Sequence, residues 1–298
     1  MIFDAIAIVG PGRMGLALGS ALDESGEVRT LTFFGRHPEP PPHPLFFEGK
    51  AEYVFGVEPL SLDTSVLVLA VPDDVLPQMA FTVAAHGAAP EGCSAFHLSA
   101  SLPTDVLGPL HERGYGVGSL LPLVDVRHSL QGGGRLKGSY FAITGSPETV
   151  ATARRLTAAI EANLIAVPAA RRPLFHAAVA MASGYMPPLL GLSMRLMERA
   201  GVTGEESLPV LAAIVRDSVR AVEERGLVEA MPDPLSGGDL EKVALHLRAL
   251  DPEDRRLYAI LGIETLRLAG DAIDAPTRVA LNELFGRYVE LETSGTGY

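Results

Sequence analysis

Three closely spaced glycines near the N-terminus constrain the fold of this chain more than any other feature. They lie in the run Gly10-Pro-Gly12-Arg-Met-Gly15, which directly follows the β-rich run Asp4–Val9. From Arg13 onward, apolar residues recur with the spacing of one helical face, namely Met14, Leu18, Ala21 and Leu22. The sequence therefore predicts a strand, a tight glycine turn and a helix in direct succession.

Each glycine of this turn has a physical reason in a dinucleotide-binding βαβ unit. Gly10 permits the tight turn, Gly12 lets the backbone approach a pyrophosphate, and Gly15 lets helix and strand pack closely. The helix that begins at Arg13 and Met14 supplies free N–H groups and a positive dipole end for phosphates. We expect these five residues to contact a dinucleotide; the alternative is an ordinary glycine turn.

The end of the next strand bears on which dinucleotide binds. A site that prefers NAD usually places Asp or Glu there for the ribose hydroxyls, but this chain reads Phe33-Phe-Gly-Arg36-His37. Arg36 can pair bidentately with a 2′-phosphate, and His37 can assist it. The sequence favours NADP and leaves NAD possible, the alternative for Arg36 being a solvated loop residue.

Two further turns follow apolar strands and should face the same cleft. Ala70-Val71-Pro72 ends the most apolar strand, where it can touch the cofactor, and Asp73 or Asp74 can cap the next helix. Ser99 and Ser101 follow the fifth strand and can hydrogen-bond a substrate or the nicotinamide. The alternative is that Ser101 or Thr104 caps a helix, and His97 is expected to be structural.

Strand-like runs alternate with helical patterns throughout residues 1–168. After the first strand they recur at Val28–Phe34, Ser65–Ala70, Ser94–Leu98, Val117–Leu120, Tyr140–Thr144 and Leu164–Val167. Such alternation predicts the α/β class with a doubly wound Rossmann sheet. Beyond residue 168 strand-like runs stop, so residues 169–298 are expected to form an all-helical substrate and dimerisation domain.

The helical half begins with an unusually apolar stretch. Pro173–Met194 contains no Asp, Glu, Lys or Arg and is long enough to span a bilayer. We interpret it as a buried helix at a subunit interface, kinked or broken at Pro187-Pro188, in preference to a membrane span. His176 lies near its start and is a candidate proton donor or acceptor, although a lone histidine on an apolar helix is also typical of a core residue.

Charge and cysteine content narrow the classes of partner. The formal net charge of −12 disfavours nucleic acid and anionic membrane surfaces. The one cysteine, Cys93, excludes an intrachain disulfide and fits a reducing cytoplasm. No His, Cys, Asp or Glu cluster has metal-ligand spacing, so no metal is expected.

Several motifs together resemble one family. They are the glycine turn, Ala70–Asp73, Phe96–Leu107, Val117–Pro122, Leu174–Ser183 and Pro234–Asp239. The chain resembles the Rossmann-like proteins whose C-terminal half is called domain of unknown function 2520, within the 6-phosphogluconate-dehydrogenase-like superfamily. That superfamily includes pyrroline-5-carboxylate reductase and the coenzyme-F420-dependent NADP reductases. The resemblance implies a dinucleotide site and a homodimer built on the helical half.

The chain departs from its relatives at positions that bear on chemistry. Leu121 and Gly184 stand where family members commonly have His and Asn, and no lysine lies between Lys137 and Lys242. The last point counts against the lysine-dependent chemistry of β-hydroxyacid dehydrogenases. The leading hypothesis is an NADP-dependent reductase of a small carbonyl or imine, with His176 as proton donor and Ser99 and Ser101 positioning substrate. The alternative is a non-catalytic dinucleotide-binding protein that senses redox state or assists assembly.

Overall fold

The computed structural model describes residues 3–126, 132–231 and 237–289 and divides into two compact units, residues 1–179 and 180–298. The first unit extends eleven residues past position 168 and includes helix α7 (Arg172–Val179). Residues 234–236 of the Pro234–Asp239 motif lie outside the described residues.

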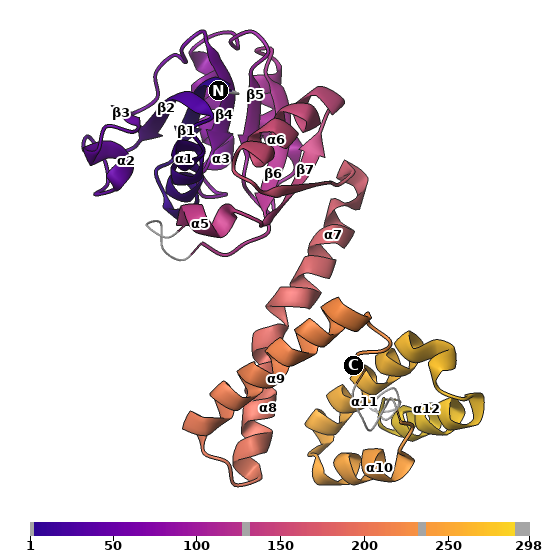
Figure 1. The fold of residues 1–298 in the computed structure, drawn as a ribbon. Coiled ribbons are helices and arrows are strands. Elements are labelled where there is room, and N and C mark those ends of the chain that lie inside the picture. The colour runs from indigo at the N-terminus through magenta and orange to yellow at the C-terminus, as the bar shows by residue number, and fades with distance from the viewer. Residues whose placement is uncertain (1–2, 127–131, 232–236, 290–298) are drawn as a thin grey trace, which may run out of the picture. The chain divides into compact units, whose positions relative to one another are not determined.

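An eight-stranded sheet forms the first unit (Figure 1). Its order is β3-β2-β1-β4-β5-β6-β7-β8; β1 to β6 run parallel, β7 pairs antiparallel with β6, and β8 is parallel to β7. The order 3-2-1-4-5-6 is that of a doubly wound dinucleotide-binding sheet, which confirms the expected fold class. The strands are β1 (Phe3–Val9), β2 (Val28–Gly35), β3 (Glu52–Phe55), β4 (Thr64–Leu69), β5 (Ser94–His97), β6 (Gly116–Pro122), β7 (Tyr140–Gly145) and β8 (Asn163–Ala166).

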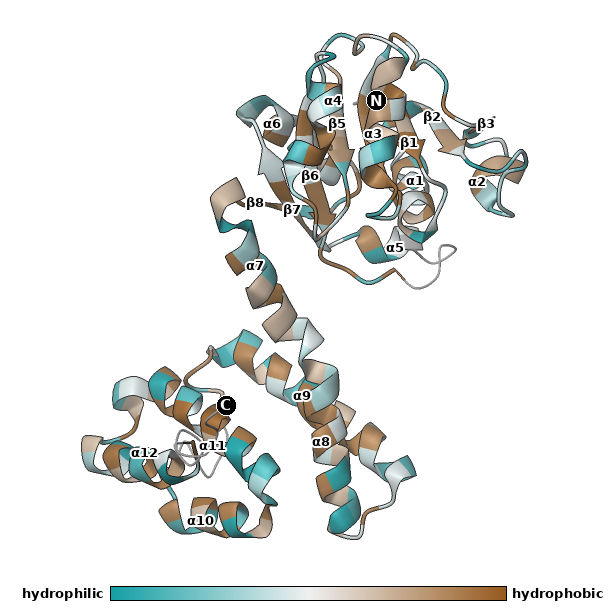
Figure 2. Cartoon of the chain, turned by 180° about the vertical axis from the view of Figure 1, so that it is seen from behind, coloured by the Kyte–Doolittle hydropathy of each residue, from teal (hydrophilic) through white to brown (hydrophobic). Residues whose placement is uncertain are grey.

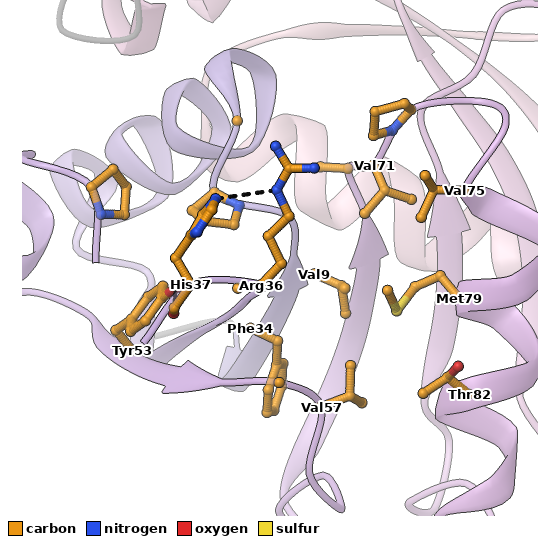
Figure 3. Close-up of a pocket in the computed structure, with 18 of the residues that line it drawn as sticks. Val9, Phe34, Arg36, His37, Tyr53, Val57, Val71, Val75, Met79 and Thr82 are labelled. Carbon is orange, nitrogen blue, oxygen red and sulfur yellow. Dashed lines mark hydrogen bonds between the residues drawn. The ribbon is translucent and has the colours of Figure 1, made fainter. Parts of the chain in front are cut away.

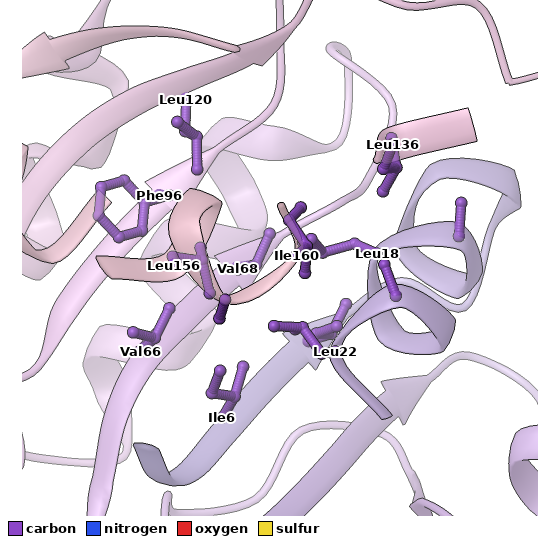
Figure 4. Close-up of a cluster of buried hydrophobic side chains, with 14 of the residues drawn as sticks. Ile6, Leu18, Leu22, Val66, Val68, Phe96, Leu120, Leu136, Leu156 and Ile160 are labelled. Atoms are coloured by element: carbon purple, nitrogen blue, oxygen red, sulfur yellow. The ribbon is translucent and has the colours of Figure 1, made fainter. Parts of the chain in front are cut away.

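Side chains alternate between two buried layers along the central strands. Ile6 and Ile8 of β1 face one core, whereas Ala7 and Val9 face the other. The first core is completed by α1, α5 and α6, including Leu18, Leu22, Leu136 and Leu156 (Figure 4). The second is completed by α3 and α4. Burial on both faces explains why these strands are continuous apolar runs.

The helices of this unit are short, and two of their caps differ from expectation. They are α1 (Arg13–Ser25), α2 (Pro44–Phe47), α3 (Leu76–Ala85), α4 (Gly108–His111), α5 (Gly132–Leu136) and α6 (Pro147–Ala159). Ser146 caps α6, because its hydroxyl accepts from the N–H of Thr149. Val75 is the N-cap of α3, so neither Asp73 nor Asp74 caps that helix. Thr104 begins a 3₁₀ turn, Thr104–Leu107, that has no side-chain cap.

The second unit is helical, as the sequence predicts. Its core lies between α10 (Leu240–Ala249), α11 (Pro252–Ala269) and α12 (Ala275–Val289). A Cβ on Gly262 of α11 would lie 2.5 Å from the Phe285 ring of α12, so the two helices pack at a glycine. Helices α8 (Met186–Arg199) and α9 (Gly204–Arg225) pack against each other, and Ser207 is their one buried residue.

The break in the long apolar helix precedes its prolines. A π-helical turn, Ala180–Gly184, separates α7 from α8, and Pro187 and Pro188 lie within the first turn of α8. Proline removes the N–H that would bond the carbonyl four residues earlier, and a wider turn accommodates those free carbonyls. The break therefore falls one turn earlier than expected.

The apolar segment Pro173–Met194 is not buried in the single chain, and its expected burial at a subunit interface remains a prediction. By length and composition, Ala169–Arg199 is the one helical run in the described residues that could cross a membrane, and none of its most apolar window is buried. Figure 2 shows hydrophobic residues distributed along α7, α8 and α9. The apolar character of this segment is thus not explained by packing within either unit taken by itself.

Candidate functional site

The turn between β1 and α1 has the geometry that the three glycines predict. Gly10 adopts a positive φ of 102°, and a Cβ there would lie 2.5 Å from the carbonyl oxygen of Ala70. A Cβ on Gly15 would collide with the carbonyl oxygen of Gly10, so only glycine lets α1 approach the strand. A Cβ on Gly12 would meet nothing within 4 Å, which leaves its surface open to a ligand.

The N-terminus of α1 is suited to an anion. Gly12 is its N-cap and offers no side-chain acceptor, and the first turn contains no acidic residue. The first amides of a helix have no partner inside the helix, so here they remain available to phosphate oxygens. Arg13 is exposed at this end, whereas Met14 packs against the first core.

A cavity of about 660 Å³ adjoins the glycine turn along the ends of β1, β2 and β4. It is lined by seven of the ten residues expected to bind cofactor: Gly10, Gly12, Arg36, His37, Ala70, Val71 and Pro72. Figure 3 shows Arg36 and His37 on one side of it and Val71, Val75 and Met79 on the other. Four further lining residues were not expected from the sequence, because they belong to no motif and reach the cavity only through tertiary packing. They are Tyr53, Val57, Val75 and Met79.

Arg36 and His37 follow the end of β2 and are polar residues of the cavity lining. Arg36 Nε donates to His37 Nε2 at 3.3 Å, and the Tyr53 hydroxyl donates to the His37 carbonyl at 2.6 Å. Glu39 lines the same cavity, so both signs of charge are present near the place expected for a ribose.

The turn after β5 is organised by Ser99. Its hydroxyl accepts from the N–H groups of Ser101 and Leu102 at 3.1 and 3.0 Å, and its own N–H donates to Nδ1 of His97 at 3.2 Å. Ser99 is buried and Ser101 is exposed. Neither Ser101 nor Thr104 caps the 3₁₀ turn, and Ser99 instead stabilises the loop that precedes it. The Ser99 O–H can still donate a hydrogen bond.

Helix α7 brings Arg172 to the same turn, and His176 follows four residues later on that helix. Arg172 Nη2 donates to the carbonyl oxygens of Ser99 and Ala100 at 3.5 and 3.4 Å. Burial lowers the pKa of both His97 and His176, and the positive charge of Arg172 lowers both by a smaller amount. The pKa of His97 falls to about 4. Asp73 and the Pro103 carbonyl act in the opposite direction on His97. Both imidazoles are therefore mostly neutral at pH 7.

Sequence reasoning identified Ser99 and His176 but missed Arg172, which lies beside both. The signal was present: Arg171-Arg172 immediately precedes the stretch that carries no charge. Of the two departures from the family pattern, Leu121 is a half-buried residue of β6, paired with Ala142 of β7, and Gly184 ends the π-helical turn.

The comparisons with known proteins agree with this fold. Residues 139–265 match the family model described as Domain of unknown function (DUF2520). This confirms the resemblance drawn from the sequence motifs. No curated protein sequence matches the chain.

Solved structures extend the likeness over nearly the whole chain. A Bacteroides fragilis protein named as an NADP oxidoreductase has a TM-score of 0.71 at 19% identity, over 88% of this chain and 97% of its own. Plasmodium falciparum pyrroline carboxylate reductase with NADP bound has 0.58 at 12% identity, over 97% and 99%. Reductive aminase from Aspergillus terreus, in complex with NADPH and ethyl-5-oxohexanoate, has 0.57 at 15% identity, over 99% and 96%. At these identities the likeness establishes the fold.

Proposed function

We propose that this chain is an NADP-dependent reductase of a small carbonyl or imine compound. The observation that carries the proposal is the cavity that joins the glycine turn to Arg36 at the ends of β1 and β2. Its two ends offer what NADP requires, namely free helix amides for a pyrophosphate and a guanidinium for a 2′-phosphate. The NADP or NADPH bound in the Plasmodium and Aspergillus structures supports the same choice of cofactor.

In this proposal the open surface of Gly12 and the first amides of α1 hold the pyrophosphate. Arg36 pairs with the 2′-phosphate, and the Ala70-Val71-Pro72 turn closes the other side of the cavity. When bound, NADPH supplies a hydride, and the protein has to orient the substrate and provide a proton.

His176 is the proposed proton donor, and its environment decides when it can act. Its pKa is lowered, so at pH 7 most molecules carry the neutral imidazole, which accepts a proton rather than giving one. Reduction should therefore accelerate as the pH falls below neutrality and His176 becomes protonated. Ser99, through its free O–H, and the exposed Ser101 are proposed to position the substrate.

The cofactor assignment is tested by titrating NADPH and NADH into wild type, Arg36→Ala and Glu39→Gln. Loss of a charge-assisted pair with phosphate should weaken NADPH binding ~10- to 100-fold in Arg36→Ala and leave NADH binding unchanged. Glu39→Gln removes a negative charge from the same cavity and should not weaken NADPH binding. The reverse pattern, in which only Glu39→Gln loses affinity, would assign the site to NAD; binding of neither nucleotide would refute a dinucleotide site.

The reductase assignment is tested by following NADPH consumption with a panel of small carbonyl and imine compounds. His176→Gln should lower kcat by ~10²- to 10⁴-fold without changing NADPH affinity, because general acid catalysis contributes about that much. The exposed His111 provides the matched control, so His111→Gln should retain full activity. Tight NADPH binding without turnover across the panel would favour the non-catalytic alternative.

We also propose that a second copy of the chain covers α8 and α9, forming a homodimer in the cytoplasm. Two helices with one buried residue between them have little to stabilise them within a single chain. Exposed apolar side chains include Leu208, Val210, Ile214 and Val219 of α9. Insertion of α9 into a lipid bilayer is disfavoured, because this helix also carries Arg216, Asp217, Arg220 and four glutamates.

A further inference from the structure

The single buried residue of α7 is an arginine. Arg172 has 8% of its surface exposed, whereas Leu174, two residues later, is 67% exposed. Its Nη2 makes two long hydrogen bonds, to the carbonyls of Ser99 and Ala100, and its Nη1 is buried with no hydrogen-bond partner among the described residues. A helix that buries a guanidinium and exposes a leucine is not anchored by hydrophobic packing.

A buried guanidinium normally has an anionic partner, because an uncompensated charge away from water is costly. No ion pair involves Arg172 in the described part of the chain. The positive charge of Arg172 lowers the pKa values of His97 and His176. Among the described residues, the positive charge of Arg172 therefore has no ion-pair partner.

A second polar group near this turn also lacks a partner. The hydroxyl of Ser119 is buried and makes no hydrogen bond with the described residues. Ser119 is the register partner of His97 on the adjacent strand β6, so it lies beside the β5 end that leads into the Ser99 turn. Buried polar groups are seldom left unpaired without a functional reason. Both groups lie toward the carboxyl ends of parallel strands, where ligands bind in sheets of this kind.

We propose that Arg172 binds the carboxylate of an anionic substrate, so that the chain acts on a small oxo acid or imino acid. A carboxylate accepts two parallel N–H bonds from a guanidinium, which would satisfy Nη1 and supply the missing charge. The proposal rests on the proposed function, because it assigns the substrate class of the same reductase site. Pairing would also reduce the positive field that disfavours protonation of His176.

Binding requires a small local rearrangement. Nη1 is closed to solvent, so the Ser99–Ala100 turn or α7 must move to admit a ligand. The bonds to be exchanged, at 3.4 and 3.5 Å, are longer than ordinary N–H···O bonds and therefore weak. α7 is also preceded by a 3₁₀ turn, Ala169–Arg171, and followed by the π-helical turn, so regular helix does not extend past either end.

The test compares acids with their neutral amides on the full chain. Binding of acetate, 2-oxobutanoate, 2-oxoglutarate and pyrrolidine-2-carboxylate is measured by calorimetry against the matching amides, for wild type, Arg172→Met and Arg172→Lys. Exposed Arg171 supplies the control variant Arg171→Gln. Wild type and Arg171→Gln should prefer at least one acid over its amide by ~10-fold or more, as expected for a charge-assisted pair. Arg172→Met should lose that preference, and Arg172→Lys should keep part of it.

Two results would overturn the proposal: no preference for acid over amide in any pair, or an equal preference in Arg172→Met that folds and binds NADPH normally. If Arg172 only held the Ser99 turn, Arg172→Met would weaken acids and amides alike. Failure of the reductase assignment looks different, since NADPH would then not be consumed although acids still bound through Arg172.

Discussion

At the scale of one residue, His97 shows how burial determines a protonation state. The side chain is fully buried, its Nδ1 accepts the Ser99 N–H, and burial together with Arg172 lowers its pKa to about 4. In the unfolded chain a histidine titrates near 6.5. The folded state therefore binds fewer protons than the unfolded state between those two values.

The pH dependence of stability follows from that difference. The lowered pKa of His97 contributes about 3 kcal/mol to the free energy of unfolding. This contribution is fully present above pH ~6.5 and is lost as the pH falls toward 4. Urea unfolding of wild type and His97→Gln at a series of pH values measures it. The variant should show a flatter decline over this range, whereas exposed His111→Gln should follow wild type. Parallel curves for wild type and His97→Gln would contradict the assignment.

At the scale of one element, the strand–turn–helix unit separates the roles of its glycines. Gly15 is enclosed by the backbone of Gly10, whereas Gly12 faces open space. Adding one methyl group therefore disturbs packing at Gly15, whereas at Gly12 it covers a surface that is open to a ligand.

We predict that Gly15→Ala lowers the free energy of unfolding by about 1–3 kcal/mol or more, because the clash is with backbone that cannot rotate away. Gly12→Ala should unfold within about 1 kcal/mol of wild type yet bind NADPH at least ~10-fold more weakly, since its methyl group occupies the surface meant for the pyrophosphate. Thermal unfolding and nucleotide titration of both variants distinguish the two effects. Equal NADPH affinity in Gly12→Ala and wild type would argue against a ligand at this turn.

At the scale of the whole molecule, the two units differ in how completely they bury their apolar residues. The sheet has two closed cores and the α10–α12 bundle a third, but α8 and α9 contribute to none of them. Exposed apolar side chains gathered on helices, such as those of α9, commonly mark an interface between chains.

We therefore predict that Ile214→Asp, on α9, converts a dimer into a monomer and lowers Tm, because a carboxylate would be buried in the interface. The control is Leu62→Asp, which changes an equally apolar and highly exposed residue of the first unit and should leave the dimer intact. Light scattering after size-exclusion chromatography measures the mass. A monomeric wild type, or a chain that partitions into lipid vesicles, would contradict the homodimer.

Local features could be predicted from the sequence. Glycine spacing predicted the first turn, and strand-like apolar runs predicted seven of the eight strands. These features depend on neighbours within a few residues, so periodicity and cap chemistry carry them. Strand β3 was missed because its four half-exposed residues, Glu52–Phe55, show no such pattern.

Which distant groups meet became clear from the three-dimensional structure alone. The antiparallel pairing of β7 with β6, the packing of Tyr53 beside Arg36 and His37, and the approach of Arg172 to the Ser99 turn join residues far apart in sequence. Burial and electrostatic fields depend on those distances in space. The sequence therefore pointed to the cofactor turn and to His176 as candidates, but the buried position of Arg172, the proposed carboxylate receptor, emerged only with the fold.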